Sequence, residues 1–158
     1  SADIISVKEF ATFSLWWAPL MRTLSLVKRD WEATDPVRVH GFIGRSRAEM
    51  KLKGKKPGTF LLRFSESVLG ALVVSFKAQL PRTASSSTPT PCSTWQERER
   101  CVNHCLVEVG QDDCCLVGES RTRYTSLGGL VRATSALTTL YPDFPKDEVF
   151  KEEPPPSP

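Results

Sequence analysis

Residues 59–67 read TFLLRFSES. Side chains of different character occupy alternate positions in this stretch. That pattern predicts a β-strand, because successive side chains of a strand point to opposite faces. Arg63 then shares a face with Leu61 and Ser65, and its backbone lies among apolar neighbours. Burying a guanidinium without a partner is costly. The strand therefore predicts that Arg63 either pairs with an internal carboxylate or receives an anionic ligand.

The residues around this arginine favour the ligand. Ser65, Glu66 and Ser67 open a turn that offers two hydroxyls and free backbone N–H groups. An arginine fork, hydroxyls and turn amides together are what a phosphate dianion requires. Arg45, at the start of a predicted helix, adds a second cation. The backbone N–H groups at the helix N-terminus would strengthen the positive electrostatic field at the site.

Two helices are predicted before this strand. Residues 8–31 carry apolar residues at spacings of three and four, which fits a helix that buries one face. Pro19 is expected in its first turn, where a missing N–H costs little. Residues 44–53 form a shorter helix, with Ser46 as N-cap and Glu49 three residues later in a capping box.

Three more strands and a helix are predicted after it. The segment 79–100 between them is rich in Ser, Thr and Pro and is expected to be a long mobile loop. Antiparallel strands with a helix on each side make an α+β fold. The predicted elements are the strands 71–78, 101–109 and 114–118, and a helix from about 127 to 140 capped by Thr125 or Ser126.

Composition limits the class of protein. The 158 residues fit one ordinary domain, and a net charge of +3 is too small for bulk nucleic-acid binding. No apolar stretch is long enough to span a membrane. The start, SADIISVKEF, lacks an initiator Met and a signal peptide, so we expect a piece of a longer chain. Five cysteines without a secretion signal indicate reduced thiols in an intracellular protein.

Longer strings in the chain resemble a known family. HGFIGRSRAEMKLKGKKPGTFLLRFSES, at 40–67, resembles the first half of an SH2 domain, and its last ten residues resemble the version found in STAT transcription factors. YPDFPKDEVF, at 141–150, is similar to the segment that closes STAT SH2 domains. CVNHCLVEV at 101–109 and RYTSLGGLV at 123–131 look like the central strand and second helix of SH2 domains.

The resemblance implies an SH2-like central antiparallel sheet flanked by two helices and preceded by a linker helix. Residues 1–37 would be the C-terminal helix of a STAT-type linker, because the Trp-rich helix before residue 31 resembles that domain. Residues 38–150 would be the SH2 domain, with 79–100 as its long loop. Residues 151–158 would be a disordered, Pro-rich tail.

The resemblance also implies a binding function without catalysis, cofactor or metal. The partner would be a tyrosine-phosphorylated receptor tail or STAT-like protein, with no direct nucleic-acid contact and no membrane insertion. A full-length parent would dimerise through phosphotyrosine and move from cytoplasm to nucleus. The implied phosphotyrosine site consists of Arg63, Arg45, Ser65, Ser67, the backbone N–H of Glu66, and His104 beside the ring. Peptide selection is assigned to Cys105 and Leu106.

Three alternatives remain. Cys92 and Arg98 have the C-x5-R spacing of a cysteine-dependent phosphatase, but the segment lacks a glycine anion loop. A zinc site could draw on the cysteines and His104, although strand alternation places Cys101 and Cys105 on one face and His104 on the other. The third alternative is a degenerate SH2 scaffold that binds no phosphate.

Overall fold

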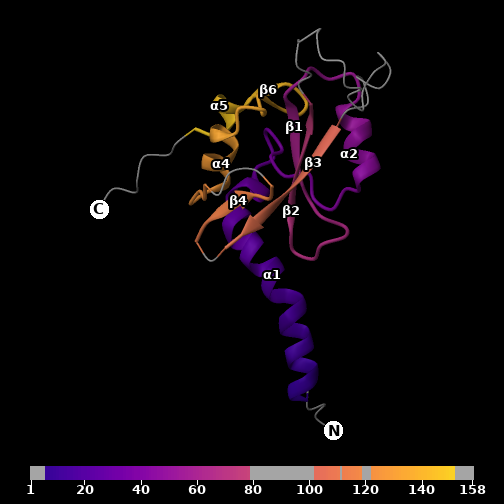
Figure 1. Ribbon diagram of the computed structural model, residues 1–158, viewed down its shortest axis with the longest axis vertical. Helices are drawn as coiled ribbons and strands as arrows, with labels where there is room; N and C mark the ends of the chain where they lie inside the picture. Colours follow the sequence, from indigo (N-terminus) through magenta and orange to yellow (C-terminus); the bar gives the residue numbers. More distant parts are fainter. Residues whose placement is uncertain (1–5, 79–101, 111, 119–121, 152–158) are drawn as a thin grey trace, which may run out of the picture.

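The computed structural model describes residues 6–78, 102–110, 112–118 and 122–151. A central sheet lies between α2 on one side and α4 on the other, and the N-terminal half of α1 projects beyond it (Figure 1). The helices are α1 (Val7–Glu32), α2 (Arg45–Leu52), α4 (Leu127–Ala133) and α5 (Lys146–Val149). The strands are β1 (Thr59–Phe64), β2 (Leu72–Lys77), β3 (Val102–Val109), β4 (Cys114–Leu116), β5 (Thr139–Leu140) and β6 (Phe144–Pro145).

The strands form one mixed sheet in the order β4-β3-β2-β1-β5-β6. The first four strands along the chain pair antiparallel, as predicted, whereas β5 runs parallel to β1. The α+β class is therefore confirmed. The strands β5 and β6 were not predicted, because two residues are too few to show an alternation.

The two faces of the sheet bury different sets of side chains. Phe60, Leu62 and Phe64 of β1 belong to the larger core, together with buried leucines of α4. Leu61 packs instead with Ala48 and Leu52 of α2. The predicted alternation is thus confirmed, and Arg63 lies on the α2 face of the sheet.

The predictions for the first two helices need correction. The first helix begins at Val7, so Pro19 lies inside it and not in its first turn. The helix-forming residues before the proline extend the helix in spite of the one backbone hydrogen bond that a proline removes. The second helix is capped by Gly44 without a side-chain hydrogen bond, so the predicted capping box of Ser46 and Glu49 is wrong.

The last predicted helix is much shorter than expected. Ser126 caps α4, as predicted, and its Oγ accepts a hydrogen bond from the backbone N of Gly129. The helix ends at Ala133, because Thr134 takes an extended backbone conformation with a ψ of 105°. The Nζ of Lys146 donates to the carbonyls of Arg132 and Thr134, which the end of the helix leaves open. Leu140 is fully buried, but it lies on β5 beside Phe60.

Parts of the predicted domain plan lie outside the described residues. The loop 79–100 and the tail from residue 152 onward are among them, and the boundary at residue 37 stays a prediction. Within the described part of the chain, no helix combines the length and apolarity that a bilayer crossing requires.

The turn between β1 and β2 docks directly on α1. Gly70 has a φ of +71°, and a Cβ there would lie 2.5 Å from the backbone N of Leu20. The Oγ1 of Thr23 donates a hydrogen bond to the carbonyl of Gly70. Glycine is therefore required at residue 70 both by the backbone conformation and by the close approach of the helix.

We predict that Gly70→Ala lowers the free energy of unfolding well beyond the cost of a left-handed backbone. Gly54 is the matched control, because it has the same φ of +71° and a Cβ added there would meet nothing within 4 Å. Gly54→Ala should cost about 1–2 kcal/mol, and Gly70→Ala at least twice as much. Urea unfolding measures both losses, and equal losses would contradict the docking argument.

Candidate functional site

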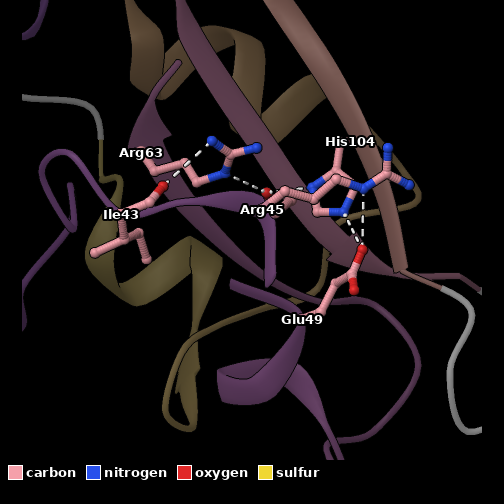
Figure 2. Close-up of polar contacts among 6 residues, drawn as sticks. Ile43, Arg45, Glu49, Arg63 and His104 are labelled. Carbon is pink, nitrogen blue, oxygen red and sulfur yellow. Dashed lines mark hydrogen bonds and ion pairs between the residues drawn. The ribbon is translucent and has the colours of Figure 1, made fainter. Parts of the chain in front are cut away.

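Arg63 is the penultimate residue of β1 and is buried, with 5% of its surface exposed. Its Nε donates to the Oγ of Ser75 at 3.1 Å. Its Nη1 donates to the carbonyl of Ile43 at 3.3 Å (Figure 2). The same Nη1 donates to the carbonyl of Phe64, also at 3.3 Å. Among the described residues these acceptors are a hydroxyl and two carbonyls, none of them a carboxylate. Nη2 makes no hydrogen bond within this part of the chain.

Burial lowers the pKa of the Arg63 guanidinium, because removal from water disfavours the charged form. The negative charge of Glu66 opposes this effect, and the positive charge of Arg45 adds to it. The guanidinium is still charged at neutral pH, since arginine has the highest pKa of the side chains. Arg63 is therefore a buried cation whose direct hydrogen bonds all go to neutral groups.

A chain of hydrogen bonds connects Arg63 to the surface, and we call it the polar chain. It runs from Arg63 to Ser75, then to His104, Glu49 and Arg45 (Figure 2). The Oγ of Ser75 lies 2.8 Å from the Nδ1 of His104, directly across the β2–β3 pair. The Oε1 of Glu49 lies 3.2 Å from the Nε2 of His104 and 3.0 Å from the Nε of Arg45.

The polar chain fixes the tautomer of His104. The carboxylate of Glu49 can only accept, so the Nε2 of His104 carries the proton and donates it. The Nδ1 then accepts from the hydroxyl of Ser75, whose oxygen accepts from Arg63. A neutral imidazole thus allows every hydrogen bond of the polar chain to form.

Two opposing effects act on the pKa of His104. Burial is the larger and lowers it, whereas the hydrogen bond to Glu49 raises it. The positive charges of Arg45 and Arg63 lower it further. The net result is a pKa below the ordinary value, which agrees with the neutral imidazole in the polar chain.

The turn after β1 is closed by a serine hydroxyl. The Oγ of Ser65 accepts from the backbone N of Ser67 at 3.3 Å and from that of Val68 at 3.0 Å. The hydroxyls of Ser65 and Ser67 are themselves 3.3 Å apart. This turn therefore holds both hydroxyls at the end of the strand that carries Arg63.

Glu66, at the tip of this turn, reaches the start of α2. A Cβ on Gly44 would lie 2.7 Å from both carboxylate oxygens of Glu66, so a side chain at residue 44 would displace the Glu66 carboxylate. The side chain thus brings negative charge to the N-terminus of the helix that carries Arg45, which favours anions.

The structure brings together most of the residues that the sequence singled out. Arg45, Arg63 and His104 belong to the polar chain, and the turn of Ser65, Glu66 and Ser67 adjoins it. The two residues predicted for peptide selection lie on opposite faces of β3. Cys105 packs against the larger core, and Leu106 lies on the other face.

Two members of the polar chain were missed by the sequence analysis. Ser75 is fully buried, and its signal was a hydroxyl within the apolar run ALVVSFKA. Glu49 was assigned to a helix cap, although its side chain faces His104 and Arg45. A helical residue four positions after Arg45 lies on the same helix face, so the spacing contained this information.

The described cysteines are separate from the polar chain. Cys105, Cys114 and Cys115 are not in disulfide bonds, and burial raises the pKa of Cys114 to about 11. Over the described ranges, no three His, Cys, Asp or Glu side chains converge to hold a metal ion. Cys92, Arg98 and Cys101 lie outside the described residues.

Comparison with known proteins places this site in a family. A sequence model of the SH2 domain matches residues 39–133, more than half of the chain. "SH2 domain-containing protein B" of Arabidopsis thaliana is 33% identical over 82 residues, which cover 47% of this chain and 12% of that protein.

Proteins named as transcription activators are also similar. Human "Signal transducer and activator of transcription 4" is 29% identical over 112 residues, 71% of this chain and 13% of that protein. The "Signal transducer and transcription activator" of Anopheles gambiae is 33% identical over 110 residues, 70% of this chain and 12% of that protein. The chain thus matches about an eighth of each relative's length.

These matches confirm the resemblance to STAT proteins that the strings at 58–67 and 145–150 indicated. The matched region 39–133 contains β1, β2, β3, α2 and α4, and so every residue of the polar chain. The chain belongs to the SH2 domain family.

Proposed function

We propose that this chain binds phosphotyrosine peptides and that Arg63 is the main phosphate-binding residue. The observation that carries the proposal is a buried guanidinium whose hydrogen bonds all go to neutral acceptors, with Nη2 unused within the described residues. A phosphate dianion would provide the anionic acceptor that the direct hydrogen bonds of Arg63 lack, and it would accept from the arginine fork. An unphosphorylated tyrosine leaves Arg63 unpaired, which makes binding depend on phosphorylation.

The other predicted residues complete the proposed site. Arg45 supplies a second, solvent-exposed cation, with 71% of its side chain accessible. The hydroxyls of Ser65 and Ser67 and the backbone N–H of Glu66 donate to the remaining phosphate oxygens. His104 lies beside the tyrosine ring as a neutral imidazole.

The peptide residues that follow phosphotyrosine would cross β3. Leu106 faces the same side as His104 and lines an apolar hollow of about 250 Å³ together with Val68 and Leu69. Cys105 points into the core, so its contribution to peptide selection would come through its backbone.

The biological role we propose follows from the named relatives. Two of them are signal transducers and activators of transcription, and this chain corresponds to about an eighth of their length. In a longer parent the module would recruit the protein to phosphorylated receptors and support phosphotyrosine-dependent dimerisation. The parent would then act in both cytoplasm and nucleus. The module itself would be neither an enzyme nor a direct nucleic-acid contact, with residues 1–37 as linker helix and 38–150 as SH2 domain.

Arg63→Ala tests the phosphate site directly. Each hydrogen bond to a charged group contributes about 1.5–3 kcal/mol, so loss of two should weaken phosphopeptide binding by about 100-fold or more. Calorimetric titration with one tyrosine peptide, phosphorylated and unphosphorylated, measures this. Arg63→Lys keeps the charge but removes the fork, and it should also bind weakly.

Arg47→Ala is the matched control, because Arg47 is an exposed arginine on α2. It should retain binding within a few-fold. A wild-type protein that is folded, by circular dichroism, and ignores a broad set of phosphopeptides would overturn the proposal in favour of the scaffold alternative.

Stability is expected to depend on pH through the two histidines. Burial lowers the pKa of both His104 and His40 in the folded chain, from an ordinary value of 6.5. The unfolded chain then binds more protons than the folded chain between the folded pKa values and 6.5, so stability rises with pH across that window. We expect the free energy of unfolding to fall as pH drops through about 6.5.

NMR titration of the two imidazoles, combined with urea unfolding at several pH values, checks this expectation. Both histidines should titrate below 6.5 in the folded protein. A His104 that titrates above this value would contradict the neutral imidazole required by the polar chain.

A further inference from the structure

We propose that Glu49 is an internal competitor for the phosphotyrosine site and lowers its affinity by holding Arg45 and His104 in the free chain. The inference rests on the proposed function of the site. The contacts of Glu49 suggest this role, and its position in a motif does not.

The contacts of Glu49 are those expected of a bound anion. Its Oε1 receives the Nε–H of Arg45 at 3.0 Å and the Nε2–H of His104 at 3.2 Å (Figure 2). Among the described residues, this is the only hydrogen bond of the Arg45 guanidinium. The carboxylate thus occupies two donors that a phosphotyrosine would otherwise meet.

The charges in the site also support the competitor role of Glu49. The hydrogen bond from Arg45 lowers the pKa of Glu49, so the carboxylate is charged at neutral pH. Arg45 and Arg63 contribute +2, and Glu49 and Glu66 contribute −2, so the free site carries a formal charge of zero. A phosphate dianion therefore enters a site whose cations are already compensated, and like charges close together disfavour binding.

The alternative role for Glu49 is to position the ligand-binding residues. In that case its hydrogen bonds to His104 and Arg45 would help binding, and their loss would weaken it. Glu49→Gln separates the two roles, because glutamine has nearly the same shape and keeps an oxygen acceptor but carries no charge. A positioning role then predicts unchanged or weaker phosphopeptide binding, whereas a competitor role predicts tighter binding.

The experiment is calorimetric titration of wild type and Glu49→Gln with the same phosphotyrosine peptide, and with phenyl phosphate as the minimal probe. We expect Glu49→Gln to bind both about tenfold more tightly. Glu148→Gln is the matched control, since Glu148 is an exposed residue of α5 and its loss removes one charge away from the polar chain. It should change affinity much less.

An independent measurement tests the contact itself. The hydrogen bond to Glu49 raises the pKa of His104, so Glu49→Gln should lower that pKa in the free protein, as read by NMR. Addition of phosphopeptide to wild type should shift the His104 Nε2 resonance as the carboxylate is displaced. Unchanged His104 signals in both cases would overturn the inference without any binding measurement.

The outcomes separate this inference from the proposed function. If wild type binds phosphopeptide and Glu49→Gln binds equally or less tightly, the competitor role is wrong and the phosphotyrosine site stands. If only Glu49→Gln binds detectably, the competitor role is supported. If neither protein binds either probe, both proposals fail.

Discussion

The burial of the Arg63 guanidinium is the constraint on which the site depends. A buried charged group in a sheet strand is costly unless polar partners meet its donors. Here the hydroxyl of Ser75 and two carbonyls accept from Nε and Nη1 without neutralising the charge, while Nη2 has no hydrogen bond within the described residues. The structure thus holds a buried cation, whose partners are Ser75 on the neighbouring strand and carbonyls that include that of Ile43, just before α2.

The two faces of the sheet differ in what they carry: one carries the larger apolar core and the other carries the polar chain. One face joins the phenylalanines of β1 to α4 and α5 in the larger core, which provides most of the apolar burial. The other face carries only a small cluster with α2, and the space beside it holds the polar chain. A polar network with this many members could not lie within the larger core, since each missing partner there would cost a desolvation penalty. Because α2 packs over β1 and β2 with only Ala48 and Leu52 buried, Arg45 and Glu49 remain in contact with water.

Strong local patterns were predictable from the sequence. The alternation in residues 59–67 correctly placed Arg63 on the same face as Leu61, and Ser126 was one of the two predicted helix caps. Weaker patterns gave wrong predictions. The leucine spacing after residue 126 suggested a long helix, whereas α4 ends at Ala133 and Leu140 pairs with β1. Lys146, 12 residues beyond Thr134, donates to the carbonyl of that residue at the end of the helix. Such contacts join residues far apart in the chain, so no local window contains them.

The sequence by itself determined the α+β class, the strand that carries Arg63, and the turn of Ser65, Glu66 and Ser67 that follows it, because these depend on residue type at short spacing. Only the tertiary structure decided which partners complete the site. Ser75 meets His104 through the pairing of β2 with β3, and Glu49 meets His104 because α2 packs beside that pair. Strand register and helix docking bring these side chains together through three-dimensional packing, which sequence spacing does not encode.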